Sequence, residues 1–221
     1  MSDSTDTPKL GSAFDAALLL ASELHRTQLR KSTSVPYVSH LLSVAALVLE
    51  DGGDEGEAIA ALLHDALEDA PDQISAEEIA QRFGSRVRDI VLACTDTPHG
   101  YAGGEKPECQ ARKSSDLADI ASGTVPYRVS LADKVHNARS ILRDRLVEGE
   151  AVWDRFTATR EQTLWYYRGL ASAYREAGAS GFLIDELERV VGELEAMAAT
   201  ARAPRARRPA VRTSPSRRPR S

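Results

Sequence analysis

The chain contains only five histidines, and one of them lies in an unusual setting. His64 follows the apolar run Ala60-Ala61-Leu62-Leu63 and opens a segment with four ionisable groups in six residues: His64, Asp65, Glu68 and Asp69. His64 and Glu68 are four residues apart, as are Asp65 and Asp69, so each pair would share one face of a helix. Burying such groups costs free energy unless they are paired or bind a metal ion. The segment therefore indicates a metal site with acidic groups beside it.

Each part of that segment, taken alone, has a simpler interpretation. A single histidine on a helix rich in Leu and Ala is usually a hydrogen-bonded core residue. Glu68-Asp69 alone would be an acidic helix end, which the helix dipole disfavours. The metal interpretation gains weight from two further segments with potential ligands, Tyr37-Val38-Ser39-His40 and Leu131-Ala132-Asp133-Lys134. We therefore interpret the three segments together as parts of one metal-dependent centre.

Apolar residues at helical spacing predict the elements that must position these groups. Pro36 suits the first turn of one helix, and Ser75-Ala76-Glu77-Glu78 has the pattern of a capping box. No stretch alternates apolar and polar residues convincingly, so we predict an all-α fold with one domain over residues 12–200. A flexible segment over residues 1–11 would precede it. Helices are expected at about 12–29, 36–49, 54–69, 75–83, 85–96, 108–122, 125–147, 150–177 and 181–200, with a Gly- and Pro-rich loop at 97–107.

Composition bounds the class of protein. Hydrophobic residues make up 42% of the 221 residues, which is enough for one compact core, and aromatic residues only 5%. The apolar runs are too short to span a bilayer. The first ten residues lack an apolar stretch, so no signal peptide is expected and a cytoplasmic location follows. Two cysteines, Cys94 and Cys109, are too few for a disulfide framework or a zinc knuckle.

The segment 201–221 differs from the rest of the chain. It holds eight arginines, four prolines and no acidic residue; removing those eight charges from the formal net charge of −5 leaves −13 for residues 1–200. Such a segment cannot bury apolar surface, so we predict a disordered, basic tail. Binding to nucleic acid or another polyanion is one interpretation. A solvated extension beside an acidic body is the simpler one, and we favour it.

Four motifs in order make the sequence similar to a known family. They are HRTQLRK (25–31), PYVSH (36–40), HDALED (64–69) and SLADKVHNAR (130–139). Together they resemble the HD-domain phosphohydrolase superfamily and, more narrowly, the single-domain small alarmone hydrolases of the RelA/SpoT type. The similarity spans about residues 12–175 and implies a single HD-domain helical bundle.

The resemblance implies a role for each group in the centre. His40, His64, Asp65 and Asp133 would hold one divalent ion, usually manganese in relatives, although the same ligands would also admit iron or zinc. The ion would polarise a phosphoryl oxygen and lower the pKa of water. Glu68 and Asp69 match the catalytic acidic pair of the family, which orients the attacking water and takes its proton.

Substrate contacts are carried over in the same way. The matching positions are Arg30, Lys31, Asn137 and, on a looser alignment, Arg112 and Lys113. For Arg30 and Lys31, a solvated helix end is the simpler alternative. Two features depart from the family: Ser130 replaces a lysine that many relatives have, and the loop 97–107 has a different sequence. Both bear on substrate identity more than on metal binding.

The implied reaction is removal of the 3′-pyrophosphate from guanosine tetra- or pentaphosphate, giving GDP or GTP and pyrophosphate. One alternative keeps the metal chemistry but changes the substrate to another nucleotide such as NADPH. A third possibility is a non-catalytic nucleotide-binding HD module, which the intact Glu68 and Asp69 disfavour. The sequence does not indicate an oligomeric state.

Overall fold

The computed structural model describes residues 10–95, 109–123 and 126–202, and these are helical apart from connecting segments and one isolated β-bridge between Leu29 and Pro36. The all-α prediction is thereby confirmed. The predicted loop 97–107, most of the tail 201–221 and the segment 1–9 lie outside the described residues. The helices are α1 (Ser12–Leu24), α2 (Val38–Glu50), α3 (Glu55–Leu63), α4 (Ala66–Asp69), α5 (Ala76–Phe83), α6 (Ser85–Cys94), α7 (Cys109–Ala121), α8 (Arg128–Glu148), the 3-10 helix η1 (Gly149–Arg155), α9 (Arg160–Glu176) and α10 (Phe182–Arg202).

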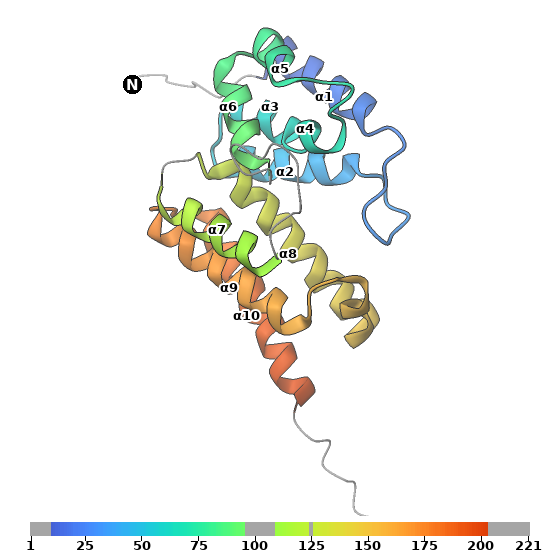
Figure 1. Cartoon of the computed structure of the whole chain (residues 1–221), viewed down its shortest axis with the longest axis vertical. Coiled ribbons are helices and arrows are strands. Elements are labelled where there is room, and N and C mark those ends of the chain that lie inside the picture. Colours follow the sequence, from blue (N-terminus) through green and yellow to red (C-terminus); the bar gives the residue numbers. More distant parts are fainter. Residues whose placement is uncertain (1–9, 96–108, 124–125, 203–221) are drawn as a thin grey trace, which may run out of the picture.

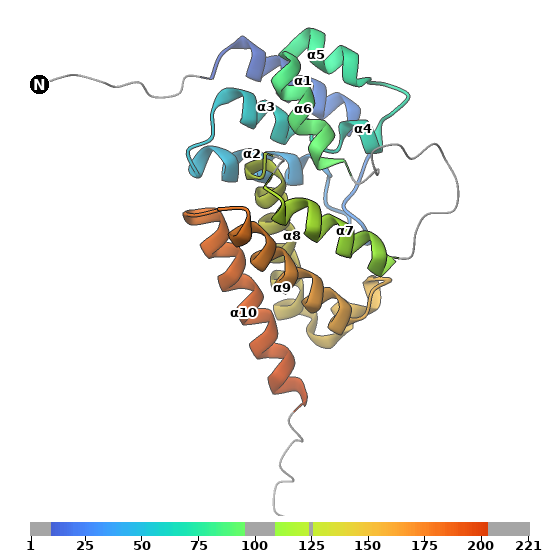
Figure 2. The ribbon, with the colours of Figure 1, turned by 60° about the vertical axis from the view of Figure 1, so that its left-hand side comes forward.

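The helices gather into two groups that share one long helix. Figures 1 and 2 show α1 to α6 at one end of the molecule and α7, α9 and α10 at the other, with α8 extending between them. Accordingly α8 packs on α2 and α3 in the first group and on α10 in the second. A residue near the start of α8 can therefore meet residues of α2 and α3.

Helix starts follow local sequence signals. Asp54 caps α3 through its Oδ1, which accepts from the Glu57 N–H at 3.0 Å. The Glu57 carboxylate in turn accepts from the Asp54 N–H. Ser75 caps α5 by accepting from Glu78 N–H at 3.1 Å, so the predicted cap forms, although the reciprocal bond is not made there. Such caps satisfy N–H groups that have no partner within the helix.

Several predicted helices end earlier than expected. The helix predicted over 54–69 is wrong as a single element, because it is interrupted between Leu63 and Ala66. The helix predicted over 12–29 stops at Leu24, and residues 25–37 form a closed loop instead. Pro36 does not open a helix, since it pairs with Leu29 and α2 starts at Val38. In both regions, local hydrogen bonds outside the helical pattern accompany the helix end: the Leu29–Pro36 bridge and the contact of His64 with the Ala61 carbonyl.

The core is built mainly of Leu, Ala, Val and Ile, as the composition predicts. It continues around the central helices, where Leu41, Leu62 and Leu131 are at most 2% exposed. Burying a side chain of this size is worth about 1.5–3 kcal/mol. Tyr166 and Tyr167 on α9 are also buried, which supports a packing role for them. Among the described residues, no helix combines the length and the apolarity needed to cross a bilayer.

Candidate metal centre and active site

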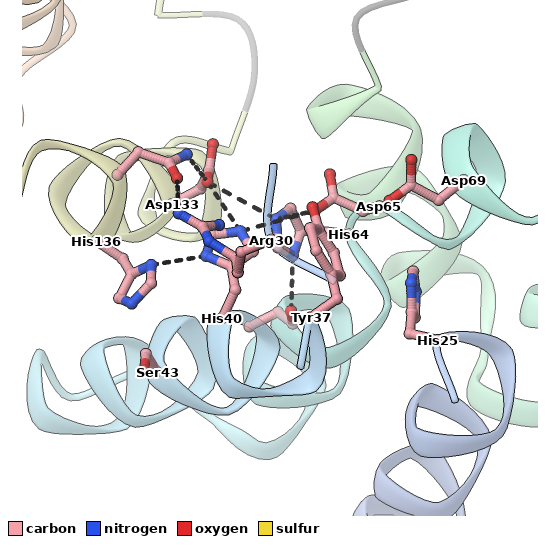
Figure 3. A network of polar contacts seen from close by, with 12 residues as sticks. His25, Arg30, Tyr37, His40, Ser43, His64, Asp65, Asp69, Asp133 and His136 are labelled. Atoms are coloured by element: carbon pink, nitrogen blue, oxygen red, sulfur yellow. Dashed lines mark hydrogen bonds and ion pairs between the residues drawn. The ribbon is translucent and has the colours of Figure 1, made fainter. Parts of the chain in front are cut away.

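Four side chains from three regions of the fold meet where α2, the α3–α4 junction and α8 come together (Figure 3). His40 Nε2 lies 3.3 Å from Asp133 Oδ1 and 3.7 Å from Asp65 Oδ2. His64 Nε2 lies 2.9 Å from the same Asp65 oxygen and 3.9 Å from Asp133 Oδ1. The structure therefore brings together His40, His64, Asp65 and Asp133, the four residues proposed from sequence.

The interruption between α3 and α4 places two neighbouring side chains on one centre. In a continuous helix, the Ala61 carbonyl would accept from the N–H of Asp65, four residues on. Instead it lies 2.8 Å from His64 Nδ1. A carbonyl can only accept, so Nδ1 carries a proton and Nε2 faces Asp65. The local backbone thus explains both the helix break and the direction of the imidazole.

His40 is oriented by a residue that the sequence analysis did not single out. Its Nδ1 lies 2.7 Å from Nδ1 of His136, one turn beyond Asp133 on α8. Burial, with His40 and Arg30 nearby, lowers the pKa of His136 to about 3, so this ring is neutral. A neutral His136 can accept from the His40 Nδ1–H, which leaves His40 Nε2 free to act as a ligand.

The carboxylates are held in the same manner. The Tyr37 hydroxyl donates to Asp65 Oδ2 at 2.5 Å, and burial together with Asp65 raises the pKa of this phenol, which stays protonated. Lys134 Nζ lies 3.2 Å from Asp133 Oδ2. Although burial opposes it, the Lys134 ammonium holds the pKa of Asp133 well below its usual range. Both carboxylates are therefore ionised at neutral pH.

The two ligand histidines differ in their electrostatics. Burial by itself lowers the pKa of His64, but the carboxylates of Asp65 and then Asp133 more than offset this and raise it to about 9. Burial lowers the pKa of His40, and Asp133 opposes this effect only in part. In the metal-free protein at pH 7, His64 therefore carries a proton beside Asp65, whereas His40 is neutral.

The residues present fit a divalent cation. His64 is 2% exposed, and its Nε2 has no partner with hydrogen-bond geometry among the described residues, although Asp65 is close. One donor atom from each of His40, His64 and Asp65 lies within 4.8 Å of the others. Asp133 contributes a second ionised oxygen beside both imidazoles. Two imidazoles and two carboxylates form a mixed nitrogen and oxygen ligand set that transition metals accept.

The acidic pair lies on α4, directly after the ligand Asp65. Glu68 and Asp69 are both exposed, and their backbone N–H groups donate to the Asp65 carbonyl at 3.1 and 2.9 Å. Asp69 also accepts from Gln28 Nε2 at 2.8 Å through its Oδ2. The pair is thus rigidly connected to the centre through the backbone while its side chains remain within reach of solvent.

Two of the predicted substrate contacts adjoin the centre. Arg30 donates from NH2 to Asn137 Oδ1 at 2.9 Å, and Asn137 donates from Nδ2 to Asp133 Oδ1 at 2.5 Å. The Arg30 backbone is fixed, because its N–H donates to the Val35 carbonyl at 2.8 Å. Arg30 and Asn137 therefore form a polar edge that begins at a ligand carboxylate.

The other three predicted contacts are Lys31, Arg112 and Lys113. Lys31 is exposed in the loop after Arg30. Arg112 and Lys113 lie on α7, which packs on α9, and Lys113 Nζ is 3.4 Å from the centre of the Tyr166 ring. Their roles in substrate binding remain predictions.

Four supporting residues escaped the sequence analysis: His25, Gln28, Tyr37 and His136. Each lies inside one of the four sequence motifs that resemble the family, so the motifs did indicate that these positions matter. Spacing could not assign them a role, because their contacts form only when the chain folds. Tyr37, for example, donates to Asp65, which is 28 residues further along the chain.

Comparison with known proteins agrees with this geometry. Residues 17–164 match the family model described as HD domain. The guanosine-3′,5′-bis(diphosphate) 3′-pyrophosphohydrolase MESH1 of Xenopus tropicalis is 36% identical over 137 residues, covering 58% of this chain and 72% of that protein. A probable enzyme of the same name from Synechocystis is 33% identical over 126 residues, but the match covers 57% of this chain and only 16% of that longer protein.

Structural comparison gives the same result. A solved structure described as a metazoan ortholog of SpoT that hydrolyses ppGpp superposes with a TM-score of 0.65 at 28% identity. The superposition covers 83% of this chain and 96% of that one. The chain therefore belongs to the HD-domain family of metal-dependent phosphohydrolases and, within it, to the small alarmone hydrolases of the RelA/SpoT type.

Proposed function

We propose that the chain is a Mn²⁺-dependent hydrolase that removes the 3′-pyrophosphate of guanosine tetra- or pentaphosphate. The observation that carries the proposal is the convergence of His40, His64, Asp65 and Asp133, with an acidic pair one turn away. The activity named for the similar Xenopus and metazoan proteins supports this substrate. The reaction consumes one water and yields GDP or GTP and pyrophosphate.

The residues of the centre would have two separate roles, metal binding and proton transfer. His40, His64, Asp65 and Asp133 would hold the ion, which supplies Lewis acidity that polarises a phosphoryl oxygen and makes water more acidic. Glu68 and Asp69 would orient the attacking water and take up its proton, since both are exposed and follow the ligand Asp65 within about one helical turn. The bond between the proximal phosphorus and the ribose 3′-oxygen breaks, and that oxygen gains a proton.

Arg30 and Asn137 would contact the nucleotide next to the ion. The guanidinium supplies positive charge for a polyphosphate, which an acidic body would otherwise repel. In the structure this guanidinium is bonded to the Asn137 amide. Substrate binding would exchange at least part of that bond for contacts to the nucleotide. Arg112 and Lys113 on α7 are proposed as further phosphate contacts.

The decisive experiment offers the purified chain, loaded with Mn²⁺, two substrates side by side. We expect release of pyrophosphate from guanosine tetraphosphate, with GDP as the nucleotide product. Release of phosphate from NADPH, with no cleavage of guanosine tetraphosphate, would overturn the proposed substrate while keeping the metal chemistry. Reloading the metal-free chain with Mn²⁺, Fe²⁺ or Zn²⁺ in separate samples tests the proposed ion.

A further inference from the structure

Gln28 connects the loop after α1 with the acidic residue Asp69 on α4. Its Nε2 lies 2.8 Å from Asp69 Oδ2, and its Oε1 lies 2.5 Å from His25 Nδ1. The backbone of Gln28 is fixed on both sides, because its N–H donates to the His25 carbonyl and its carbonyl accepts from Tyr37 N–H. His25 is only 2% exposed. A chain of hydrogen bonds thus runs from an exposed carboxylate to a buried imidazole.

The side-chain amide can face these two partners in only one direction. An ionised Asp69 carboxylate accepts hydrogen bonds and cannot donate, so it must meet the NH₂ end of Gln28. The amide oxygen then faces His25, and Nδ1 of that ring must carry the proton. The reverse orientation would place the amide oxygen 2.8 Å from a carboxylate oxygen, with no proton between them. The Asp69 carboxylate therefore fixes the direction of the Gln28 amide, and His25 holds the amide oxygen by donating from Nδ1.

The remaining nitrogen of His25 is consistent with this assignment. With the proton on Nδ1, Nε2 is an acceptor. It is buried and has no hydrogen-bond partner among the described residues. The ring also stacks on Tyr37, whose hydroxyl donates to Asp65. One buried ring therefore supports both the residue that orients Asp65 and the residue that orients Asp69.

Asp69 needs such support. It is exposed and ends α4, a helix of four residues, and so short a helix is not stable by itself. A lysine or arginine could hold the carboxylate, but its positive charge would stabilise the ionised form and make the group a weaker base. A neutral amide orients the carboxylate without that effect.

We propose that Gln28 is a positioning residue that orients the Asp69 carboxylate for proton transfer, with its own amide oxygen held by His25. This role rests on the proposed function of Asp69 as a proton acceptor. It is distinct from metal binding, because Gln28 contacts none of the four ligands in the described part of the chain.

A double-mutant cycle tests the proposal. Gln28→Leu keeps the approximate size of the side chain but removes the amide, and it should lower kcat about 30-fold while KM changes by about twofold or less. Metal content should match that of the unsubstituted chain. Gln81→Leu, the same change at an exposed position of α5, is the control and should leave kcat unchanged.

The cycle is completed in a chain that carries Asp69→Asn. There, Gln28→Leu should alter kcat by about twofold or less, because the group that it orients can no longer accept a proton. An equal fall in both backgrounds would contradict the proposal, as would a rise in KM with unchanged kcat. The cycle is run on guanosine tetraphosphate and on bis(p-nitrophenyl) phosphate. Failure with guanosine tetraphosphate alone refutes the proposed substrate and leaves the cycle measurable on the second compound.

NMR of the metal-free chain gives a readout that needs no turnover. The side-chain amide resonances of Gln28 should shift in Asp69→Asn, because the hydrogen bond from Gln28 to the carboxylate is lost. The ring nitrogens of His25 should show the proton on Nδ1 at neutral pH. A Gln28 amide that is insensitive to Asp69→Asn, or a His25 proton on Nε2, would overturn the assignment.

Discussion

The ligand cluster and the basic residues assigned to substrate binding differ in how firmly the fold holds them. His40 is buried on α2 and His64 directly after α3, and each has its Nδ1 within hydrogen-bond distance of a half-buried or backbone partner. Lys31 is exposed in a loop, and Lys113 lies on α7, which packs mainly on α9. The fold thus prearranges the four proposed metal ligands, whereas some of the proposed substrate contacts lie on more peripheral segments.

The largest effect is expected from the ligand cluster. Asp65→Ala removes an ionised oxygen that lies 2.9 Å from His64 Nε2, so metal content should fall below about one tenth of an equivalent. Turnover should fall at least about 1,000-fold, since the Lewis acid is lost with the ion. Metal analysis and steady-state kinetics measure the two quantities. Asp89→Ala, at an exposed position of α6, is the matched control and should retain both metal and turnover. If Asp65→Ala retained its metal, Asp65 would not be a ligand.

Arg30 lies at the border between the two regions, so its substitution should have an intermediate effect. Arg30→Ala removes the guanidinium that is bonded to Asn137, and we expect KM for guanosine tetraphosphate to rise about 10- to 50-fold. Metal content should not change, because Arg30 contacts no ligand directly in the described residues. Arg30→Lys should recover only part of the loss, since it restores the charge but not the planar fork. Loss of the metal in Arg30→Ala would show that Arg30 supports metal binding and is not only a substrate contact.

The electrostatics of the cluster predict a pH dependence of metal binding. The pKa of His64 is raised to about 9 in the metal-free protein, so its proton must leave when an ion binds below that pH. The apparent association constant for Mn²⁺ should therefore rise about tenfold per pH unit between about pH 7 and 9 and level off above pH 9. His40 adds no further proton, because its pKa is lowered. Calorimetry in buffers of different ionisation enthalpy should detect release of about one proton at pH 7.5, and no release would contradict the assignment.

The smallest effects are expected at the periphery. Lys31→Ala removes an exposed charge next to Arg30, and KM should change by about threefold or less because solvent and salt screen such a charge. Kinetics at low and at physiological salt would show the difference shrinking as the salt concentration rises. A tenfold or larger effect on KM at physiological salt would indicate that Lys31 contacts the substrate directly. The loop that carries Lys31 would then belong to the substrate site.

Sequence reasoning was strongest where residue type restricts chemistry. His64-Asp65 was found because ionisable groups rarely follow a run such as Ala60-Ala61-Leu62-Leu63, and the all-helical fold followed from the apolar spacing. The resemblance to a family supplied His40 and Asp133, whose spacing in sequence does not reveal that they meet. The domain boundaries and the substrate contacts remain predictions.

The rest could not be predicted because it depends on contacts between distant segments. Gln28 and Asp69 are 41 residues apart, and His40 and His136 are 96 apart. Only packing of the helices makes them neighbours. The early end of α1 has a different, local origin, since residues 25–37 close on themselves through the Leu29–Pro36 bridge.

The interruption at His64-Asp65 also limits how the motif can be transplanted. On an unbroken helix, adjacent side chains diverge by about 100°, so an inserted His-Asp dipeptide would send its two donors to different faces. A designer who wishes to build this centre in another helical bundle must therefore copy the backbone break, together with the carbonyl at Ala61 that His64 engages. The unit that must be transferred is the end of one helix followed by a second, short helix. The His-Asp dipeptide alone is not sufficient.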